Sequence, residues 1–140
     1  MACAAGAHFL VNPGLTPELH EAAPKSGRMR VPGVQTASEA MAARRFGYRL
    51  MKYYPAEPSN GLVVLEDYAN MFHNVAFMAT GKIKSDLLAA YRRLANVAAV
   101  DGSRMLKPAA MEQFSEDRSR FLAVRPASSV AGFPITSATP

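Results

Sequence analysis

The sequence predicts an α/β fold built from about five parallel βα units. Two observations carry this prediction: short apolar runs alternate with segments that bear helix-start signals, and the runs recur at intervals of roughly 20 residues. Glycine, proline or asparagine follows most of the runs, as is usual where a strand ends in a turn. Because strands that alternate with helices form parallel sheets with right-handed crossovers, we expect their carboxyl ends to meet at one edge.

Five apolar runs are the candidate strands. They cover residues 7–12, 29–34, 48–54, 75–79 and 97–100. Pro13-Gly14 follows the first run, Pro55 stops the third, and Gly81 follows the fourth. Proline and glycine break strands because proline lacks an N–H donor and glycine adopts turn conformations freely.

Helix signals lie between these runs. Thr16 followed by Pro17 is typical of a helix N-cap with proline at the first helical position. Thr36 and Glu39 have the spacing of a capping box, and Gly47 suits the position just after a helix over residues 37–46. Further helices are expected over residues 61–71, 84–94 and 109–122.

The order of the units leaves a doubly wound sheet and a barrel open. No Gly-x-Gly-x-x-Gly follows any predicted strand, which disfavours a dinucleotide-binding fold. A complete (β/α)₈ barrel needs about 200 residues or more, so a barrel of 140 residues would be partial. We expect one domain over residues 1–124 and a flexible tail rich in Ser, Thr, Ala and Pro over residues 125–140.

The composition narrows the function classes. With 49% hydrophobic and 19% charged residues, the chain can bury a globular core. No apolar run approaches the ~18 residues that span a membrane, and the amino terminus lacks the basic segment of a signal peptide. The single cysteine, Cys3, fits a reducing compartment. We therefore expect a cytoplasmic protein with no membrane partner.

The net charge of +5 is compatible with a solvated basic surface or with a site for phosphorylated metabolites. The lysines and arginines are scattered, and no basic block or zinc-finger spacing indicates a nucleic-acid partner. His8, His20 and His73 lack the spacing of metal ligands, so no metal site is predicted.

Lys52 is the candidate for chemistry. It lies inside the run 48–54, where alternation places Leu50, Lys52 and Tyr54 on one face of a strand that ends at Pro55. Catalytic groups of parallel barrels sit at such carboxyl ends. A desolvated lysine favours its neutral amine, which can attack a ketone and form an imine. The alternative is a lysine at a sheet edge or with its ammonium in solvent.

Two turns after the last two predicted strands contain glycine: Thr80-Gly81-Lys82 and Asp101-Gly102-Ser103. Glycine lets backbone N–H groups approach an anion, and the loops after the last two strands of a barrel often bind phosphate. These turns are therefore a candidate phosphate site. The alternative is that they are ordinary strand-ending turns.

Five segments together resemble the 2-keto-3-deoxy-6-phosphogluconate (KDPG) / 4-hydroxy-2-oxoglutarate aldolase family, in its order and spacing. Residues 9–14 resemble its F-x-V-S-P-G segment, residues 31–39 its P-G-V-x-T-x-x-E run, and residues 50–57 its L-K-F-F-P-A-E run. Residues 77–83 resemble F-x-P-T-G-G-I, and residues 100–103 resemble V-G-G-S.

The resemblance implies the C-terminal part, strands 4–8, of a (β/α)₈ TIM barrel of the class I aldolases. It implies a carbon–carbon lyase that cleaves KDPG to pyruvate and glyceraldehyde 3-phosphate, and in some members 4-hydroxy-2-oxoglutarate. The family uses no metal or organic cofactor and is usually homotrimeric. The implied roles are catalytic for Lys52, substrate-binding for Tyr54 and Thr80, and phosphate-binding for Gly81, Lys82, Gly102 and Ser103.

The chain departs from the family at four positions in these motifs. Lys82 and Asp101 each replace a glycine, Ala79 replaces a proline, and Arg104 replaces a tryptophan. Lys82 could pair with phosphate or obstruct backbone approach, whereas Asp101 would repel phosphate at close range. The resemblance begins near the fourth family strand, so the family's glutamate acid/base and its arginine and threonine carboxylate ligands find no counterpart by position.

Two functional hypotheses therefore stay open. The first is an aldolase-type lyase whose substrate is a phosphorylated 2-keto-3-deoxy sugar acid and whose product is pyruvate. The second is a catalytically impaired remnant of that barrel, with weak imine formation or phosphate binding, because loss of a general acid/base lowers rates by ~10²–10⁴-fold. An unclosed parallel sheet leaves unpaired edges, so we expect self-association or a partner that supplies further strands.

Overall fold

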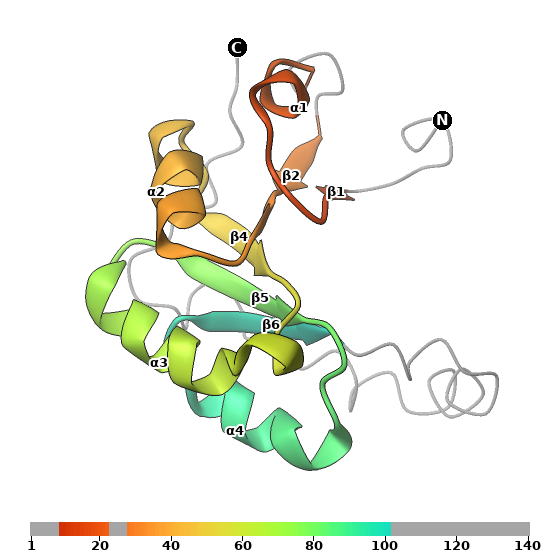
Figure 1. The fold of residues 1–140 in the computed structure, drawn as a ribbon, viewed down its shortest axis with the longest axis vertical. Helices are drawn as coiled ribbons and strands as arrows, with labels where there is room; N and C mark the ends of the chain where they lie inside the picture. Colours follow the sequence, from red (N-terminus) through yellow and green to blue (C-terminus); the bar gives the residue numbers. More distant parts are fainter. Residues whose placement is uncertain (1–8, 23–27, 102–140) are drawn as a thin grey trace, which may run out of the picture.

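The computed structural model describes residues 9–22 and 28–101 of the 140-residue chain (Figure 1). Several sequence predictions fall outside these residues: the helix over 109–122, the tail over 125–140, and the site residues Gly102 and Ser103.

The strands are parallel and follow one another in chain order. They are β1 (Phe9–Val11), β2 (Met29–Val31), β3 (Gly33–Val34), β4 (Leu50–Tyr53), β5 (Ala76–Thr80) and β6 (Val97–Asp101). A two-stranded sheet pairs β1 with β2, and a four-stranded sheet has the order β3-β4-β5-β6. The predicted parallel βα units are confirmed. Consecutive order fits a barrel rather than a doubly wound sheet, whose strand order reverses, and the described strands do not close into a ring.

The predicted run 29–34 is divided at Pro32 into β2 and β3. The Val31 carbonyl accepts a hydrogen bond from the Asn12 N–H at 3.2 Å, whereas the Pro32 carbonyl accepts one from the Lys52 N–H at 2.7 Å. The segment thus changes partner from β1 to β4 at a residue that has no N–H to donate. It joins the two sheets into one series of neighbouring strands.

Gly33 is required where this series is tightest. A Cβ at Gly33 would lie 2.0 Å from the Pro13 carbonyl oxygen, so any side chain would push the loop after β1 away. The loop and β3 can be adjacent only because position 33 has no side chain.

The helices are α1 (Pro17–Glu21), α2 (Ala37–Arg45), α3 (Gly61–Met71) and α4 (Leu88–Arg93), with short 3₁₀ turns η2 (Glu57–Ser59) and η3 (Ser85–Leu87). The predicted starts are confirmed. The Thr16 hydroxyl accepts from the Leu19 N–H at 3.2 Å, and Thr36 with Glu39 forms the full capping box of α2. Gly47 follows α2 with φ of +88°. The predicted helix over 84–94 begins as η3 and continues as α4.

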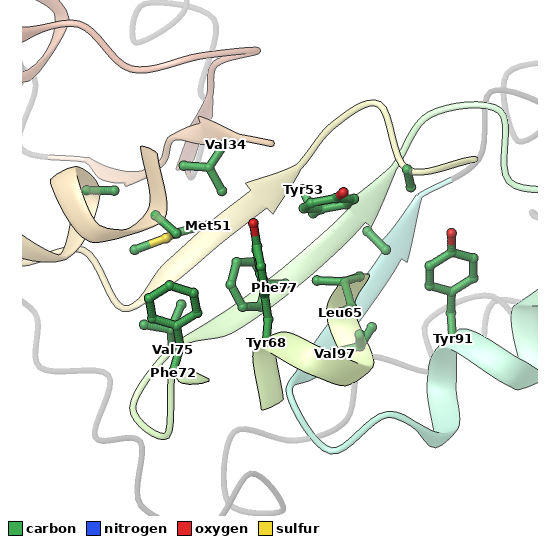
Figure 2. Packing of buried hydrophobic residues seen from close by; sticks show 14 of the residues in the cluster. Val34, Met51, Tyr53, Leu65, Tyr68, Phe72, Val75, Phe77, Tyr91 and Val97 are labelled. Carbon is green, nitrogen blue, oxygen red and sulfur yellow. The ribbon is translucent and has the colours of Figure 1, made fainter. Parts of the chain in front are cut away.

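The core lies between the sheet and the helices that follow its strands (Figure 2). Phe77 of β5 is fully buried against Tyr68 of α3, their ring centroids 5.7 Å apart, and Tyr68 also meets Tyr53 and Phe72 edge-on. Burial of this aromatic cluster supplies apolar stabilisation and raises the pKa of Tyr68, whose hydroxyl donates to the Gln35 carbonyl at 3.3 Å.

Within the described ranges, none of the helices combines the length and apolar character of a bilayer span.

Candidate active site

Lys52 lies on the face of β4 that points away from the helices. Met51 and Tyr53 belong to the buried core, whereas Leu50 and Lys52 are half-buried on the opposite face. The predicted alternation along this strand is therefore confirmed. In a barrel, the face opposite the helices is the inner one.

Parallel pairing sets the neighbours of Lys52. Gly33 of β3 and Met78 of β5 are its register partners on either side, and Met78 in turn is paired with Ala99 of β6. Met78 is half-buried on the same face, so its thioether side chain flanks the lysine. Sequence analysis assigned no role to Met78. Alternation along residues 75–79 could have given its face, whereas its place beside Lys52 follows from the register of β4 and β5.

The ammonium of Lys52 stands over the ring of Tyr54, with Nζ 4.6 Å from the ring centroid. Tyr54 is the first residue after β4, so the lysine side chain is directed toward the carboxyl end of the strand. The negative face of an aromatic ring attracts a cation, and Tyr54 thereby orients Nζ. Tyr54 is 40% exposed, so this end of the site is reachable from solvent.

Gly81 holds the loops after β4 and β5 together. Its φ is +111°, and a Cβ at this position would lie 3.1 Å from both the Tyr54 ring and the Cα of Pro55. The Ala56 N–H donates to the Thr80 carbonyl at 2.8 Å and the Glu57 N–H to the Gly81 carbonyl at 3.2 Å. The absence of a side chain at Gly81 thus lets the Tyr54 ring take its place beneath Lys52.

Thr80 and Lys82 flank this glycine. Thr80 is buried at the end of β5, and its hydroxyl lies 3.5 Å from the Met78 carbonyl. Lys82 is exposed, with φ of +58°, in the turn that follows. The structure therefore brings Lys52, Tyr54, Thr80 and Gly81 to one edge of the sheet, with Lys82 in the adjoining turn.

Glu57, in the turn after β4, carries a carboxylate near this edge, but its side chain faces the helices. Its Oε1 accepts a hydrogen bond from the Tyr91 hydroxyl at 2.6 Å, and Tyr91 is fully buried in α4. Burial first, and then the Glu57 contact, raise the pKa of Tyr91 far above its usual value. Glu57 therefore secures the turn after β4 to α4 rather than facing Lys52.

Ser59 is a further residue without a prior assignment. Its hydroxyl contacts the Tyr53 hydroxyl at 3.1 Å and the carbonyls of Pro55 and Ala56. These contacts brace the turn that carries Tyr54. A serine two residues after a glutamate in a turn gives no sequence signal for them, since they depend on how the turn folds back.

Among the described residues, no group of three histidine, cysteine or acidic side chains could hold a metal ion.

Parallel βα units in consecutive order, with a lysine on the inner face at the strands' carboxyl ends, define a (β/α) barrel with a candidate amine nucleophile. The family model "Aldolase: KDPG and KHG aldolase" matches residues 1–122. The chain belongs to the KDPG and KHG aldolase family.

Sequence relatives agree with this assignment. The chain is 36% identical over 129 residues to a 2-dehydro-3-deoxy-phosphogluconate aldolase of Pseudoalteromonas atlantica, covering 92% of this chain and 60% of the relative. It is 41% identical over 109 residues to the enzyme of that name from Pseudomonas aeruginosa, covering 78% and 50%. The chain thus spans about half to three fifths of the length of these relatives.

Solved structures show the same fold. A KDPG aldolase from Legionella pneumophila, with pyruvate captured as a covalent carbinolamine, matches with a TM-score of 0.71 and 38% identity over 80% of this chain and 54% of that one. A Zymomonas mobilis aldolase with 3-phosphoglycerate matches with a TM-score of 0.72 and 30% identity over 84% and 59%. The described residues therefore have the fold of one part of a (β/α)₈ barrel.

Proposed function

We propose that this chain carries the imine-forming half of a class I aldolase that cleaves KDPG to pyruvate and glyceraldehyde 3-phosphate, and also acts on 4-hydroxy-2-oxoglutarate. The observation that carries the proposal is the position of Lys52: on the inner face, at the carboxyl end of β4, with Nζ over the Tyr54 ring. The covalent carbinolamine of the Legionella relative supports a lysine adduct with a 2-oxo acid.

Lys52 is the nucleophile in this proposal. Its neutral amine attacks C2 of the 2-oxo acid, and loss of water gives an iminium ion. A base takes the proton of the C4 hydroxyl, the C3–C4 bond breaks, and its electron pair moves into the iminium as an enamine. The aldehyde leaves, the enamine is protonated at C3, and water releases pyruvate and restores the amine.

The neighbouring residues bind the rest of the substrate. Tyr54 and Thr80 line the space around the imine, since both lie at the level that Nζ reaches. Gly81 and Lys82, in the turn after β5, are the residues nearest to the phosphate in this proposal. The other two candidate phosphate ligands, Gly102 and Ser103, lie outside the described residues. Backbone N–H groups at glycines and a lysine ammonium suit an anionic group.

We also propose an oligomeric state and a cellular compartment for the chain. The family resemblance supports self-association, as a homotrimer, and no metal or organic cofactor. The single Cys3 suits a reducing cytoplasm. The division into a barrel part over residues 1–124 and a tail over residues 125–140 remains an expectation, since residues 102–140 lie outside the described part of the chain.

A second candidate function is imine formation with impaired turnover. It is favoured by Glu57, whose hydrogen bond to the buried Tyr91 hydroxyl directs this carboxylate away from Lys52. A chain of this kind forms the lysine adduct but transfers protons slowly.

Borohydride reduction in the presence of pyruvate tests the proposal. The expected result is a pyruvyl adduct that peptide mass mapping places on Lys52 and that is lost in Lys52→Ala. Lys84→Ala, which removes an exposed lysine before η3, is the matched control and keeps the adduct. A folded wild-type chain without an adduct would overturn the proposal. An adduct on Lys52 without cleavage of KDPG would favour the second candidate function, imine formation with impaired turnover.

A further inference from the structure

We propose that Asp101 sets the specificity of this site, by disfavouring substrates whose far end carries phosphate relative to those whose far end is uncharged. This inference rests on the proposed imine chemistry of Lys52. It concerns the part of the substrate that extends beyond the reacting carbons.

Strand register puts Asp101 on the same face as Lys52. Val100 pairs with Ala79, and both belong with the core on the helix side, whereas Asp101 pairs with Thr80 on the opposite side. Met78 of β5 pairs with Ala99 of β6 and with Lys52 of β4, so these three residues lie on the same face of the sheet as Asp101. Side chains at paired positions of parallel strands point the same way. Asp101 and Lys52 therefore point toward the same face.

Asp101 also lies at the same height along the strands as the Nζ atom of Lys52. Lys52 Nζ lies over Tyr54, two residues beyond Lys52 and level with Thr80, the partner of Asp101. With parallel strands ~4.8 Å apart, Asp101 is about 10 Å across the sheet from β4. A chain of several carbons bonded to Nζ and lying across β5 brings its far end to this carboxylate.

The charge of Asp101 is not neutralised by the described residues. It is exposed at the end of β6, and among the described residues no hydrogen bond or ion pair is made to its side-chain carboxylate. Two other carboxylates accept hydrogen bonds within the fold: Glu57 from the Tyr91 hydroxyl, and Glu39 from the backbone N–H groups of Gln35 and Thr36. Within the described part of the chain, Asp101 thus presents a negative charge at the carboxyl end of β6, on the face of Lys52.

Lys82 is the opposing charge at the same edge. It is exposed in the turn two residues beyond Thr80, at the end of a long flexible side chain that loses conformational freedom whenever it is held in one position. The backbone of Asp101 is held by pairing with Thr80, and its side chain is short, so the carboxylate samples a smaller volume than the Lys82 ammonium does. We infer that repulsion from Asp101 outweighs attraction by Lys82.

The test compares KDPG with its dephosphorylated form, 2-keto-3-deoxygluconate, in borohydride trapping at equal subsaturating concentrations. The measured quantity is the labelling rate of Lys52. Six-carbon and pyruvyl adducts are added together, because cleavage converts the first into the second and would otherwise change the measured rate. The wild type is expected to be labelled faster by the dephosphorylated acid, by roughly tenfold, the scale of one carboxylate opposing a dianion near water. Raising the ionic strength should reduce this ratio, because salt screens exposed charges.

Three variants separate the charges. Asp101→Asn is expected to lower the ratio at least fivefold and to remove its salt dependence. Lys82→Met is expected to raise it. Asp67→Asn makes the same change of charge at an exposed position of α3 and is expected to leave it unchanged.

The outcomes distinguish this inference from the function on which it rests. Failure of pyruvate to label Lys52 in the folded wild type overturns both. Labelling by pyruvate together with a wild-type preference for KDPG, or with a ratio that Asp101→Asn does not change, overturns the role of Asp101 alone.

Discussion

The two faces of the sheet place different demands on the sequence, and β4 carries both within four residues. Met51 and Tyr53 are buried against the helices, where packing decides which side chain fits. Lys52, between them, is half-buried on the other face, where its ammonium stands over the Tyr54 ring at the carboxyl end of the strand. Substitutions on the helix side should therefore alter stability, and those on the inner face should alter chemistry.

The largest effect on stability is expected from Phe77→Ala. Phe77 is fully buried in the core, and truncating a buried phenylalanine destabilises a protein by about 3–5 kcal/mol. Met78→Ala, one residue further and on the inner face, should destabilise the chain much less, because Met78 is only half-buried. Urea denaturation followed by circular dichroism measures both, and equal losses would contradict the division between the faces.

Gly81→Ala should disturb the inner face through the backbone. The added Cβ would lie 3.1 Å from the Tyr54 ring and from Pro55, in a conformation with φ of +111°. We expect a loss of roughly 1–3 kcal/mol from a non-glycine residue held there, together with displacement of Tyr54. The rate of pyruvyl labelling of Lys52 should fall. Gly47→Ala also has positive φ but has no atom within 4 Å of the added Cβ, so it should lose stability while labelling persists.

Whether a feature of the fold or of the site could be predicted from the sequence depends on how far apart in the chain the interacting residues are. The capping box of α2 involves residues three apart and was predicted in full. The face of Lys52 follows from alternation within one strand. The contact of Glu57 with Tyr91 joins residues 34 apart, and the contact of Gly81 with Tyr54 joins two loops, so neither could be predicted before the strands were placed.

The division of the run 29–34 into β2 and β3 was not predicted, because the run was taken as a single strand. The change of partner from β1 to β4 at Pro32 depends on where those strands lie. Asp101 shows the same limit. Its replacement of a glycine was visible in the motif, whereas its position on the face of Lys52 follows from pairing with Thr80.

Tyr91→Phe tests how much a polar contact on the helix side of the sheet contributes to stability. It removes the hydroxyl that donates to Glu57, and we expect a loss of about 1–2 kcal/mol at neutral pH. Pyruvyl labelling of Lys52 should be unaffected, because Tyr91 and Glu57 both face away from it. A fall in labelling without loss of stability would show that Glu57 serves the chemistry.

The same tyrosine predicts a pH dependence. The folded pKa of Tyr91 is raised, so the unfolded chain releases this proton first as the pH rises above the ordinary value of 10.0. Stability is therefore fully present below that pH and is lost above it. The raised pKa of Tyr68 acts in the same direction. Urea midpoints measured from pH 8 to pH 11 should fall less steeply in Tyr91→Phe than in the wild type; parallel slopes would contradict this.

The smallest effect is expected at the start of α2. Thr36 accepts from the Glu39 N–H, and Glu39 accepts from the N–H groups of Thr36 and Gln35, which lowers the pKa of Glu39. Thr36→Ala should destabilise the chain by about 1 kcal/mol, whereas Thr36→Ser keeps the cap. Because the pKa of Glu39 is lowered, its contribution is present above the ordinary value of 4.5 and is lost as the pH falls below it. Thermal denaturation at pH 7 and pH 4 measures both effects. Labelling of Lys52 should stay at the wild-type rate in Thr36→Ala, since this cap stabilises the helix layer and contacts none of the residues around Nζ.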